Sequence, residues 1–294
     1  MATTAIKKKK SKLNAVGIFD VFLTVFMLAF MACIIVPFLH VIAVSLSANK
    51  YVMANMVGIF PMGFTFDTYV QILSTGSFLQ AYGNTIWYTA VGTLCSLTVT
   101  AMAAYALARG KLVGHKFFSI MITVTMFFSG GLIPTYMAIR DYGLINSRWV
   151  MILPSLCSTW NLIVLRSFFV AYPQEIIESG QLDGLQEAGV FFRLVLPTSK
   201  AALATIGLYY AVAYWNNYMT AKLYIRDQDL WPVSCLLRQI LDQAGHQQTE
   251  EGTRMVEATV RYASIMIVIT PIMCVYPWLQ KYFVKGVMVG SIKG

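Results

Sequence analysis

Six long runs of apolar residues, each free of charged side chains, limit this chain to one broad class of protein. The runs lie at residues 21–44, 81–108, 117–139, 149–165, 201–221 and 262–279. A helix needs about 20 mainly apolar residues to cross roughly 30 Å of lipid hydrocarbon. The apolar content of 57% and the mean hydropathy of +0.64 are typical of membrane proteins. The sequence therefore predicts an all-α integral membrane protein with six transmembrane helices.

The distribution of charge predicts which side of the membrane each connecting segment meets. Six spans put both termini on one side, so the segments alternate between two faces. One face carries 14 basic and 5 acidic residues and the other carries 8 of each, so the whole net charge of +9 lies on one face. Basic loops remain in the cytoplasm, which predicts cytoplasmic termini. Charge placed in this way fits contact with lipid headgroups and argues against a nucleic-acid partner.

Residues that could support chemistry or bind metal are sparse. The five cysteines form no C-x-x-C pair and the three histidines lie far apart in the sequence. We expect the cysteines to be unpaired, buried apolar side chains, and we expect no metal site. No G-x-x-x-x-G-K-[ST] phosphate-binding loop is present. If transport by this chain uses ATP, hydrolysis must therefore occur on another polypeptide, and this chain is expected to be non-catalytic.

A polar segment between the fourth and fifth runs, residues 172–197, is predicted to form two short helices on the cytoplasmic side. Pro173 favours a helix start, because proline suits the first turn. Gly184 can adopt the left-handed conformation that ends a helix. A second helix is expected over residues 185–196, and Pro197 is expected to stop it. The segment would thus present a glycine turn to the cytoplasm.

The same segment resembles a known family. Glu178, the pair Asp183-Gly184 and the pair Leu196-Pro197 form an E-x-x-x-x-D-G pattern followed by L-P. This pattern is similar to the cytoplasmic-loop motif of permease subunits in bacterial binding-protein-dependent ABC importers. The resemblance implies a type I importer permease fold, with a coupling helix between spans four and five that docks onto a separate ATPase subunit. The expected coupling residues are Glu178, Ser179, Gly180, Asp183, Gly184, Leu196 and Pro197.

Ser179 and Gly180 stand where two alanines are typical of the family, and Leu185 replaces a further alanine. Further stretches resemble the carbohydrate-uptake branch, and within it the permeases for complex oligosaccharides, such as alginate, aldouronate and rhamnogalacturonan fragments. These stretches are Phe64 to Tyr69, Ala81 to Thr85, residues 127–136, Asp229 to Pro232 and Val284 to Gly294.

The resemblance implies a simple domain organisation. Residues 1–20 form a basic cytoplasmic N-terminus, and residues 21–294 form a single permease domain with its core at 81–284. The domain includes the cytoplasmic coupling loop 172–197 and an extracytoplasmic loop, 222–260.

Aromatic and amide side chains in the fifth run suggest a substrate pathway. Tyr210, Tyr214 and Asn217 recur at helical spacing. Sugars offer hydroxyl groups for amides and ring faces for aromatic stacking. The expected pathway residues are Tyr210, Tyr214, Trp215, Asn216, Asn217 and the kink glycines Gly130 and Gly131. An aromatic belt at the membrane interface, and kinks that serve packing alone, remain the alternatives.

The sequence thus predicts a permease subunit of an ATP-driven importer that moves a sugar, such as an oligosaccharide, across the bacterial cytoplasmic membrane. The implied partners are a second permease, two ATP-binding subunits that hold ATP and magnesium, and an extracytoplasmic solute-binding protein. No cofactor is expected on this chain. The alternative is a secondary transporter or channel subunit driven by an ion gradient. Such proteins usually hold an ionisable residue in mid-membrane, and the six runs contain none besides His40.

Overall fold

The chain is mainly helical in the part that its computed structural model describes, residues 18–110, 113–246, 259–275 and 277. Among these residues, the β-type pairing is a single isolated bridge between Ser47 and Phe64. The all-α class predicted from the sequence is confirmed. The longer helices are α1 (Ile18–Ser45), α4 (Gly76–Ala108), α5 (His115–Phe127), α6 (Leu132–Asp141), α7 (Thr159–Val170), α11 (Lys200–Trp215), α13 (Val233–His246) and a final helix, Thr259–Val275.

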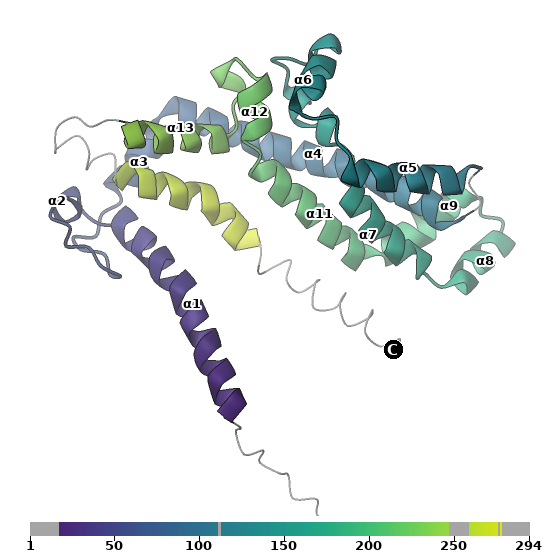
Figure 1. Ribbon diagram of the computed structural model, residues 1–294, viewed down its shortest axis with the longest axis horizontal. Helices are drawn as coiled ribbons and strands as arrows, with labels where there is room; N and C mark the ends of the chain where they lie inside the picture. The colour runs from purple at the N-terminus through teal and green to yellow at the C-terminus, as the bar shows by residue number, and fades with distance from the viewer. Residues whose placement is uncertain (1–17, 111–112, 247–258, 276, 278–294) are drawn as a thin grey trace, which may run out of the picture.

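Shorter helices join these elements. They are α2 (Asn49–Met53), α3 (Asp67–Ser74), α8 (Gln174–Leu182), α9 (Glu187–Val190), α10 (Leu196–Thr198) and α12 (Met219–Tyr224), with 3-10 turns η1 (Arg148–Met151), η2 (Leu153–Ser155) and η4 (Gln228–Leu230) and one π-helical turn, η3 (Phe191–Val195). In Figure 1, α8 and α9 lie at one end of α4, and α3 and α13 lie toward its other end.

Helix α4 is the centre of the bundle, and α7 and α11 pack along it. Every fourth residue of α4 is buried, which places one continuous stripe against these neighbours: Tyr88, Gly92, Ser96, Thr100 and Ala104. Four of the five are small, and small residues let helix backbones approach closely inside a membrane. A Cβ atom on Gly92 would lie only 2.8 Å from the Tyr214 ring of α11. The tight crossing of α4 and α11 therefore depends on glycine at this position.

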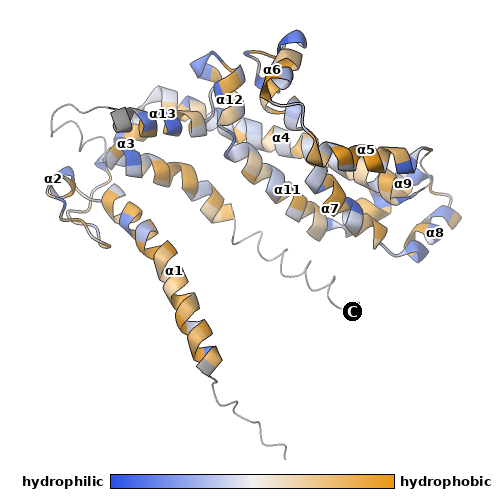
Figure 2. Cartoon of the chain, in the orientation of Figure 1, coloured by the Kyte–Doolittle hydropathy of each residue, from blue (hydrophilic) through white to orange (hydrophobic). Residues whose placement is uncertain are grey.

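Helix α1 stands apart from the bundle, as Figures 1 and 2 show. Its 27-residue apolar stretch, Phe19–Ser45, is long enough to span a membrane, yet its apolar window is 0% buried. The rest of the chain packs against α1 only near the C-terminal end of this helix, where Ala43 and Val44 are buried. A helix that is apolar on all sides requires a non-aqueous environment. Lipid or another subunit must therefore surround α1.

Only α1 and α4 are long and apolar enough to cross a membrane as single helices among the described residues. Three further pairs of helices pass the same test when each pair is taken together, but each is bent. The predicted third span, 117–139, is wrong as one helix, because α5 and α6 meet at 117°. Gly131, which precedes α6 at this break, has a φ of +81°, a conformation that residues other than glycine rarely adopt.

The fourth and fifth predicted spans also change. Residues 149–165 do not form one helix, because the stretch Arg148–Ser155, which contains Pro154, meets α7 at a 51° bend. Helix α11 ends at Trp215, six residues before the predicted end of the fifth span at residue 221. Asn216 Nδ2 donates to the Val212 carbonyl, and Asn217 Oδ1 accepts from Thr220 N–H. Such amide side chains compete with helical backbone bonds, which explains the early end.

The sixth predicted span, 262–279, corresponds to the 17-residue helix Thr259–Val275, and its remaining residues lie mainly outside the described part of the chain. All five cysteines are free, as predicted. The expectation that they are buried is wrong for three of them, because Cys33, Cys157 and Cys274 are exposed on the surface of this chain. Apolar surroundings at these three positions are compatible with contact with lipid or with a neighbouring subunit, as well as with burial in a protein core.

Candidate functional site

A cavity of about 530 Å³ opens beside α11 where the 155–158 segment turns into α7. Three of the predicted pathway residues, Tyr210, Tyr214 and Asn217, line it together. The opposite wall adds residues that the sequence did not single out: Ser155, Cys157, Ser158, Trp160 and Asn161. None of the ten lining residues is charged. The cavity therefore offers amides, hydroxyls and aromatic faces, the groups that bind uncharged polar ligands.

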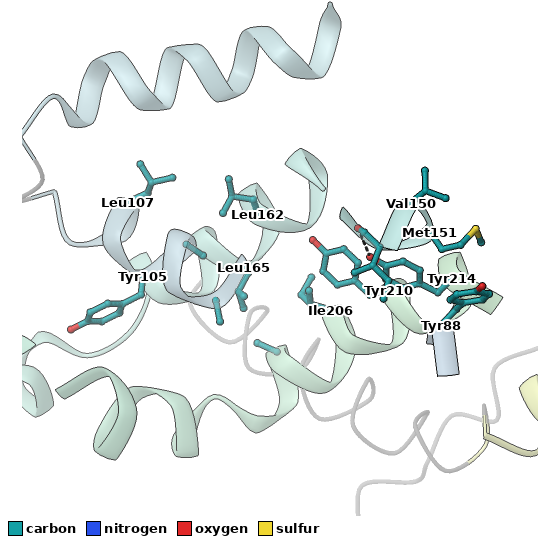
Figure 3. Close-up of a cluster of buried hydrophobic side chains, with 14 of the residues drawn as sticks. Tyr88, Tyr105, Leu107, Val150, Met151, Leu162, Leu165, Ile206, Tyr210 and Tyr214 are labelled. Atoms are coloured by element: carbon teal, nitrogen blue, oxygen red, sulfur yellow. Dashed lines mark hydrogen bonds between the residues drawn. The ribbon is translucent and has the colours of Figure 1, made fainter. Parts of the chain in front are cut away.

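The two tyrosines use their hydroxyl groups to hold the cavity wall in place. Tyr210 Oη lies 2.7 Å from Thr100 Oγ1 and accepts the Ser158 N–H at 2.9 Å. Tyr214 Oη lies 2.8 Å from Ser96 Oγ of α4. Both side chains are only 3% exposed, so an aromatic belt at the membrane interface does not describe them. Figure 3 shows both rings on α11 close to Val150 and Met151.

The amide groups of the cavity make fewer hydrogen bonds within the protein than the tyrosine hydroxyls do, and its indole ring is exposed. Trp160 is 58% exposed. Within the described residues, the side-chain amide of Asn161 has no hydrogen-bond partner, although its backbone N–H donates to Ser158 Oγ at 3.5 Å. Asn217 uses its Oδ1 atom to accept the Thr220 N–H, and its amide nitrogen has no described partner. Ligand hydroxyls would therefore meet Asn161 and Asn217 more readily than the tyrosine hydroxyls.

The other four predicted pathway residues do not line this cavity. Trp215 donates from its indole nitrogen to the Val268 carbonyl of the final helix at 3.1 Å, and its ring packs against Tyr82. Asn216 is exposed and bonded within α11. Gly130 and Gly131 are exposed at the break between α5 and α6. The structure thus groups Tyr210, Tyr214 and Asn217 and separates the remaining four.

The predicted glycine turn is present in the 172–197 segment. Gly184 has a φ of +83°, as expected for a left-handed helix end. The Leu185 N–H bonds to the Gly180 carbonyl and the Gly184 N–H bonds to the Gln181 carbonyl, each at 3.0 Å. This pair of bonds is a Schellman motif, which satisfies carbonyls at the end of α8. The second helix runs over Glu187–Thr198, contains a π-helical turn at Phe191–Val195 and ends one residue after Pro197, close to the predicted stop.

Helix α8 has one packed face and one exposed face. Ile177 is 2% exposed, and a Cβ atom on Gly180 would lie 2.5 Å from Leu194 Cδ1. Glycine in place of the usual alanine therefore fits the close approach of Leu194. Glu178, Ser179, Asp183 and Gly184 are exposed, and Leu182 is 88% exposed. The predicted coupling residues Leu196 and Pro197 lie farther along, half-buried and exposed respectively.

Glu187 connects this segment to α4, and sequence analysis did not single it out. Its carboxylate accepts from Arg109 Nε at 3.2 Å and from Arg109 Nη2 at 3.1 Å. Tyr105 Oη and Gln181 Nε2 also donate to it, each at 3.1 Å. We call this region, formed by the last turn of α4 with α8 and α9, the Arg109 end. A bidentate pair of this kind fixes orientation as well as distance.

Buried hydrogen bonds hold the opposite part of α4, which we call the Asn84 end. Asn84 Nδ2 donates to the Asp229 carbonyl at 2.7 Å and to the Trp231 carbonyl at 3.2 Å. Thr85 Oγ1 accepts the Val233 N–H at 2.7 Å, and Tyr88 Oη donates to the Leu230 carbonyl at 2.8 Å. Two stretches that are far apart in the sequence, 81–85 and 229–232, thus meet here.

Fold and site define an all-helical membrane protein with an uncharged polar cavity and an exposed turn at one end of the central helix. Comparisons with known proteins extend this description. The chain is 38% identical over 282 residues to the polygalacturonan/rhamnogalacturonan transport system permease protein YtcP of Bacillus subtilis, covering 94% of this chain and 99% of that protein. It is 39% identical over 281 residues to the B. subtilis protein LplC, covering 94% and 95%. No family model matches the chain.

A solved structure agrees with these sequence relatives. A bacterial ABC transporter involved in the import of the acidic polysaccharide alginate contains a chain that superposes with a TM-score of 0.85 at 29% identity, covering 92% of this chain and 98% of that one. This chain therefore belongs to the family of permease subunits of carbohydrate ABC transport systems. The family assigned by resemblance from the sequence is confirmed, and with it a location in a membrane.

Proposed function

We propose that this permease carries an oligosaccharide across the bacterial cytoplasmic membrane into the cell, driven by ATP that separate subunits hydrolyse. A second permease, two ATP-binding subunits with ATP and magnesium, and an extracytoplasmic solute-binding protein complete the proposed importer. Support for the cargo comes from relatives named for polygalacturonan, rhamnogalacturonan and arabinooligosaccharides. The observation that carries the proposal is that α4 connects an exposed turn at the Arg109 end with an uncharged cavity between α7 and α11.

The proposed topology has six spans and places the Arg109 end in the cytoplasm with both termini. The bent pairs α5–α6 and η1–α7 each count as one span, together with α1, α4, α11 and the final helix. Support comes from the charge distribution, because all the net charge lies on the face that contains Arg109. The Asn84 end, with α12 and α13, then lies outside. Cysteine labelling of Leu182→Cys from the cytoplasmic side only supports this orientation, and labelling from outside contradicts it.

The exposed turn of α8 is the proposed docking surface for an ATP-binding subunit. Leu182 is an apolar side chain that is almost fully exposed beside the exposed carboxylates of Glu178 and Asp183. Large exposed apolar side chains next to polar ones are common at interfaces between proteins. Leu182→Asp should weaken co-purification of the ATP-binding subunit. Met219→Asp is the matched control, since Met219 is 53% exposed near the opposite end. Equal retention of the ATP-binding subunit in both variants would refute this docking surface.

The cavity is the proposed passage for sugar. Its volume of about 530 Å³ is in the range of roughly 300–1,000 Å³ that is usual for ligand pockets. Trp160 supplies an exposed ring face, and Asn161 and Asn217 supply amide groups. Tyr210 and Tyr214 hold the wall through their hydroxyls. The kink glycines Gly130 and Gly131, with Trp215 and Asn216, stay proposed pathway residues that lie outside this cavity.

The cavity proposal is tested by uptake in cells that produce equal amounts of assembled transporter. Asn217→Ala and Trp160→Ala should each reduce oligosaccharide uptake, since each removes a group that faces the cavity. Tyr142→Ala is the control, because Tyr142 is 81% exposed and does not line the cavity. Tyr214→Ala should disturb both uptake and packing, whereas Tyr214→Phe keeps the ring and removes only the hydroxyl, with its bonds to Ser96 and to the Ile152 and Ser155 carbonyls. Normal uptake in Asn217→Ala and Trp160→Ala would reject the cavity as the passage.

A further inference from the structure

A second cavity, of about 350 Å³, lies between α5 and Arg166 of α7, near the Arg109 end. Three cationic or titratable side chains line the part of the cavity at the N-terminal end of α5: His115, Lys116 and Arg166. His115 Nε2 lies 2.7 Å from the Leu107 carbonyl, and Arg166 Nε donates to the same carbonyl at 3.3 Å. This shared contact at the end of α4 holds the two side chains close to each other. No carboxylate lines the cavity.

The positive charge at this site is uncompensated within the described residues. Lys116 has no described hydrogen bond or ion pair, and the Nη1 and Nη2 groups of Arg166 have no described partner. The first turn of α5 adds unpaired backbone N–H groups and the positive end of a 13-residue helix. One turn along, Ser119 Oγ is buried without a hydrogen-bond partner and lines the same cavity. These groups together favour an anion with several acceptor oxygens, such as phosphate.

The part of the cavity farther along α5 is apolar. Ile120 and Val124 line it, and they are 55% and 46% exposed on the surface of α5. Their positions repeat at four-residue spacing after Lys116, so one face of α5 changes from cationic to apolar over two turns. The only hydroxyl at this depth, on Thr123, donates to the Ser119 carbonyl at 2.8 Å. A free phosphate ion would leave this apolar half unfilled.

We propose that the groove between α5 and α7 binds an anionic phospholipid, with its phosphate among His115, Lys116, Arg166 and Ser119 and an acyl chain along Ile120 and Val124. The order of the groups along the helix matches the order in the lipid, from charged head to apolar chain. Basic pockets between membrane helices are suited to anionic headgroups. The lipid site is separate from the sugar cavity and does not depend on which sugar is carried.

The test uses the purified importer complex in detergent, titrated with phosphatidylglycerol and monitored by native mass spectrometry. Lys116→Gln removes a charge that makes no described contact, so it leaves the fold intact. Lys116→Gln with Arg166→Gln should weaken phosphatidylglycerol binding roughly 30-fold, if each cation contributes as is usual near a membrane surface. Arg193→Gln with Lys200→Gln is the matched control, since both residues are exposed in the segments just before and at the start of α11. This control should bind lipid as the unmodified complex does.

A second variant keeps every cation and fills the apolar half instead. Ile120→Trp should also reduce retention of phosphatidylglycerol, while phosphatidylcholine should bind weakly to all forms. Equal binding of phosphatidylglycerol by the Lys116 and Arg166 variant and by the control pair would overturn the proposal. Displacement of the lipid by millimolar inorganic phosphate, with no effect of Ile120→Trp, would also overturn it in favour of a simple ion site. So would lipid binding by the isolated chain that disappears when the second permease is present.

Discussion

The two ends of α4 are held by different chemistry. At the Asn84 end, side chains that are almost fully buried bond to backbone carbonyls and N–H groups of the 229–233 segment. At the Arg109 end, α4 meets the α8–α9 segment through Glu187, whose side chain is 47% exposed. Leaving a buried polar group without its partner costs about 1–3 kcal/mol. The Arg109 side chain is 11% exposed, but water can reach Glu187 and replace part of its bonds, which lowers the cost of breaking them. The Asn84 end is thus shielded from water on both sides of its bonds, whereas the Arg109 end is open to water on the Glu187 side.

This difference fits the proposed function. A permease that receives a movement at its cytoplasmic end needs a junction there that can shift without unfolding. Helix α4 also carries Ser96 and Thr100, the residues that bond to the cavity tyrosines. A displacement of α4 at the Arg109 end would therefore reach the cavity wall directly. The variants below test this contrast between the two ends.

The largest expected effect is that of Gly184→Pro. Proline requires a φ near −65°, whereas Gly184 has a φ of +83° and donates its N–H to Gln181. The turn would have to refold, so ATP-driven uptake should be lost. Gly143→Pro is the control, because Gly143 has a φ of +67° in a turn after α6. Similar uptake by the two variants, at equal levels of assembled transporter, would contradict a special role for the Arg109 end.

Glu187→Ala should uncouple the importer with little loss of stability. The change removes the bonds from Arg109, Tyr105 and Gln181 at once, but Glu187 is half exposed, so water can replace part of these bonds and the loss should be smaller than at a fully buried site. We expect ATPase activity that no longer responds to the loaded solute-binding protein, measured in proteoliposomes. Glu187→Gln keeps the acceptor oxygen and should retain part of the response. A large fall in melting temperature with normal coupling would reverse our assignment of the two ends.

Asn84→Ala should produce the opposite pattern. The Trp231 carbonyl loses its described donor, the Asp229 carbonyl keeps only Gln80 Nε2, and Arg148 loses its acceptor on Asn84. We therefore expect a loss of about 2 kcal/mol in stability and a lower melting temperature. The coupling ratio, sugar molecules imported per ATP hydrolysed, should stay close to that of the unmodified protein. Thermal unfolding in detergent and uptake in proteoliposomes measure the two quantities. An unchanged melting temperature would show that these bonds do not fix the Asn84 end.

The smallest effect is expected for thiol labelling at Cys235 in α13, which reports on packing at the Asn84 end. Burial raises the pKa of the Cys235 thiol to about 11, although the nearby Lys222 opposes the shift. The reactive thiolate is the deprotonated form, so at pH 8 its fraction should be about a hundredfold below that of a thiol of pKa 9. Maleimide labelling should increase as pH rises toward 11. Rapid labelling at pH 8, in a variant with the other four cysteines replaced, would indicate that this end opens.

Much of the architecture was predictable, because the length of an apolar run and the chemistry of a turn depend on residues that are adjacent in the sequence. The run at 81–108 became α4, and Gly184 took the left-handed conformation that ends α8. The grouping of Tyr210, Tyr214 and Asn217 also followed from helical spacing. The 117° break between α5 and α6 did not follow, although Gly130 and Gly131 were noted, because glycine permits a bend without setting its angle.

The missed residues share one property, which is that their role depends on a partner distant in sequence. Asn84 bonds to residues about 145 positions away, and Arg109 bonds to Glu187 across 78 positions. Trp160 and Asn161 join the cavity from α7, opposite the tyrosines of α11. Periodicity shows which face of a helix is buried but does not identify the segment that covers it. The only sequence signal for the Asn84 end was the resemblance of the 81–85 and 229–232 stretches to the same branch of the family.

The most direct test of the proposed function is uptake by the purified importer, with this chain and its partner subunits reconstituted in proteoliposomes. The cognate solute-binding protein, loaded with a radiolabelled oligosaccharide that it binds, is supplied on the side of the Asn84 end, and ATP with magnesium on the side of the Arg109 end. We predict uptake that requires ATP and the binding protein and that persists when ionophores dissipate every ion gradient. Uptake that proceeds without ATP and stops on addition of the ionophores would contradict the proposed function.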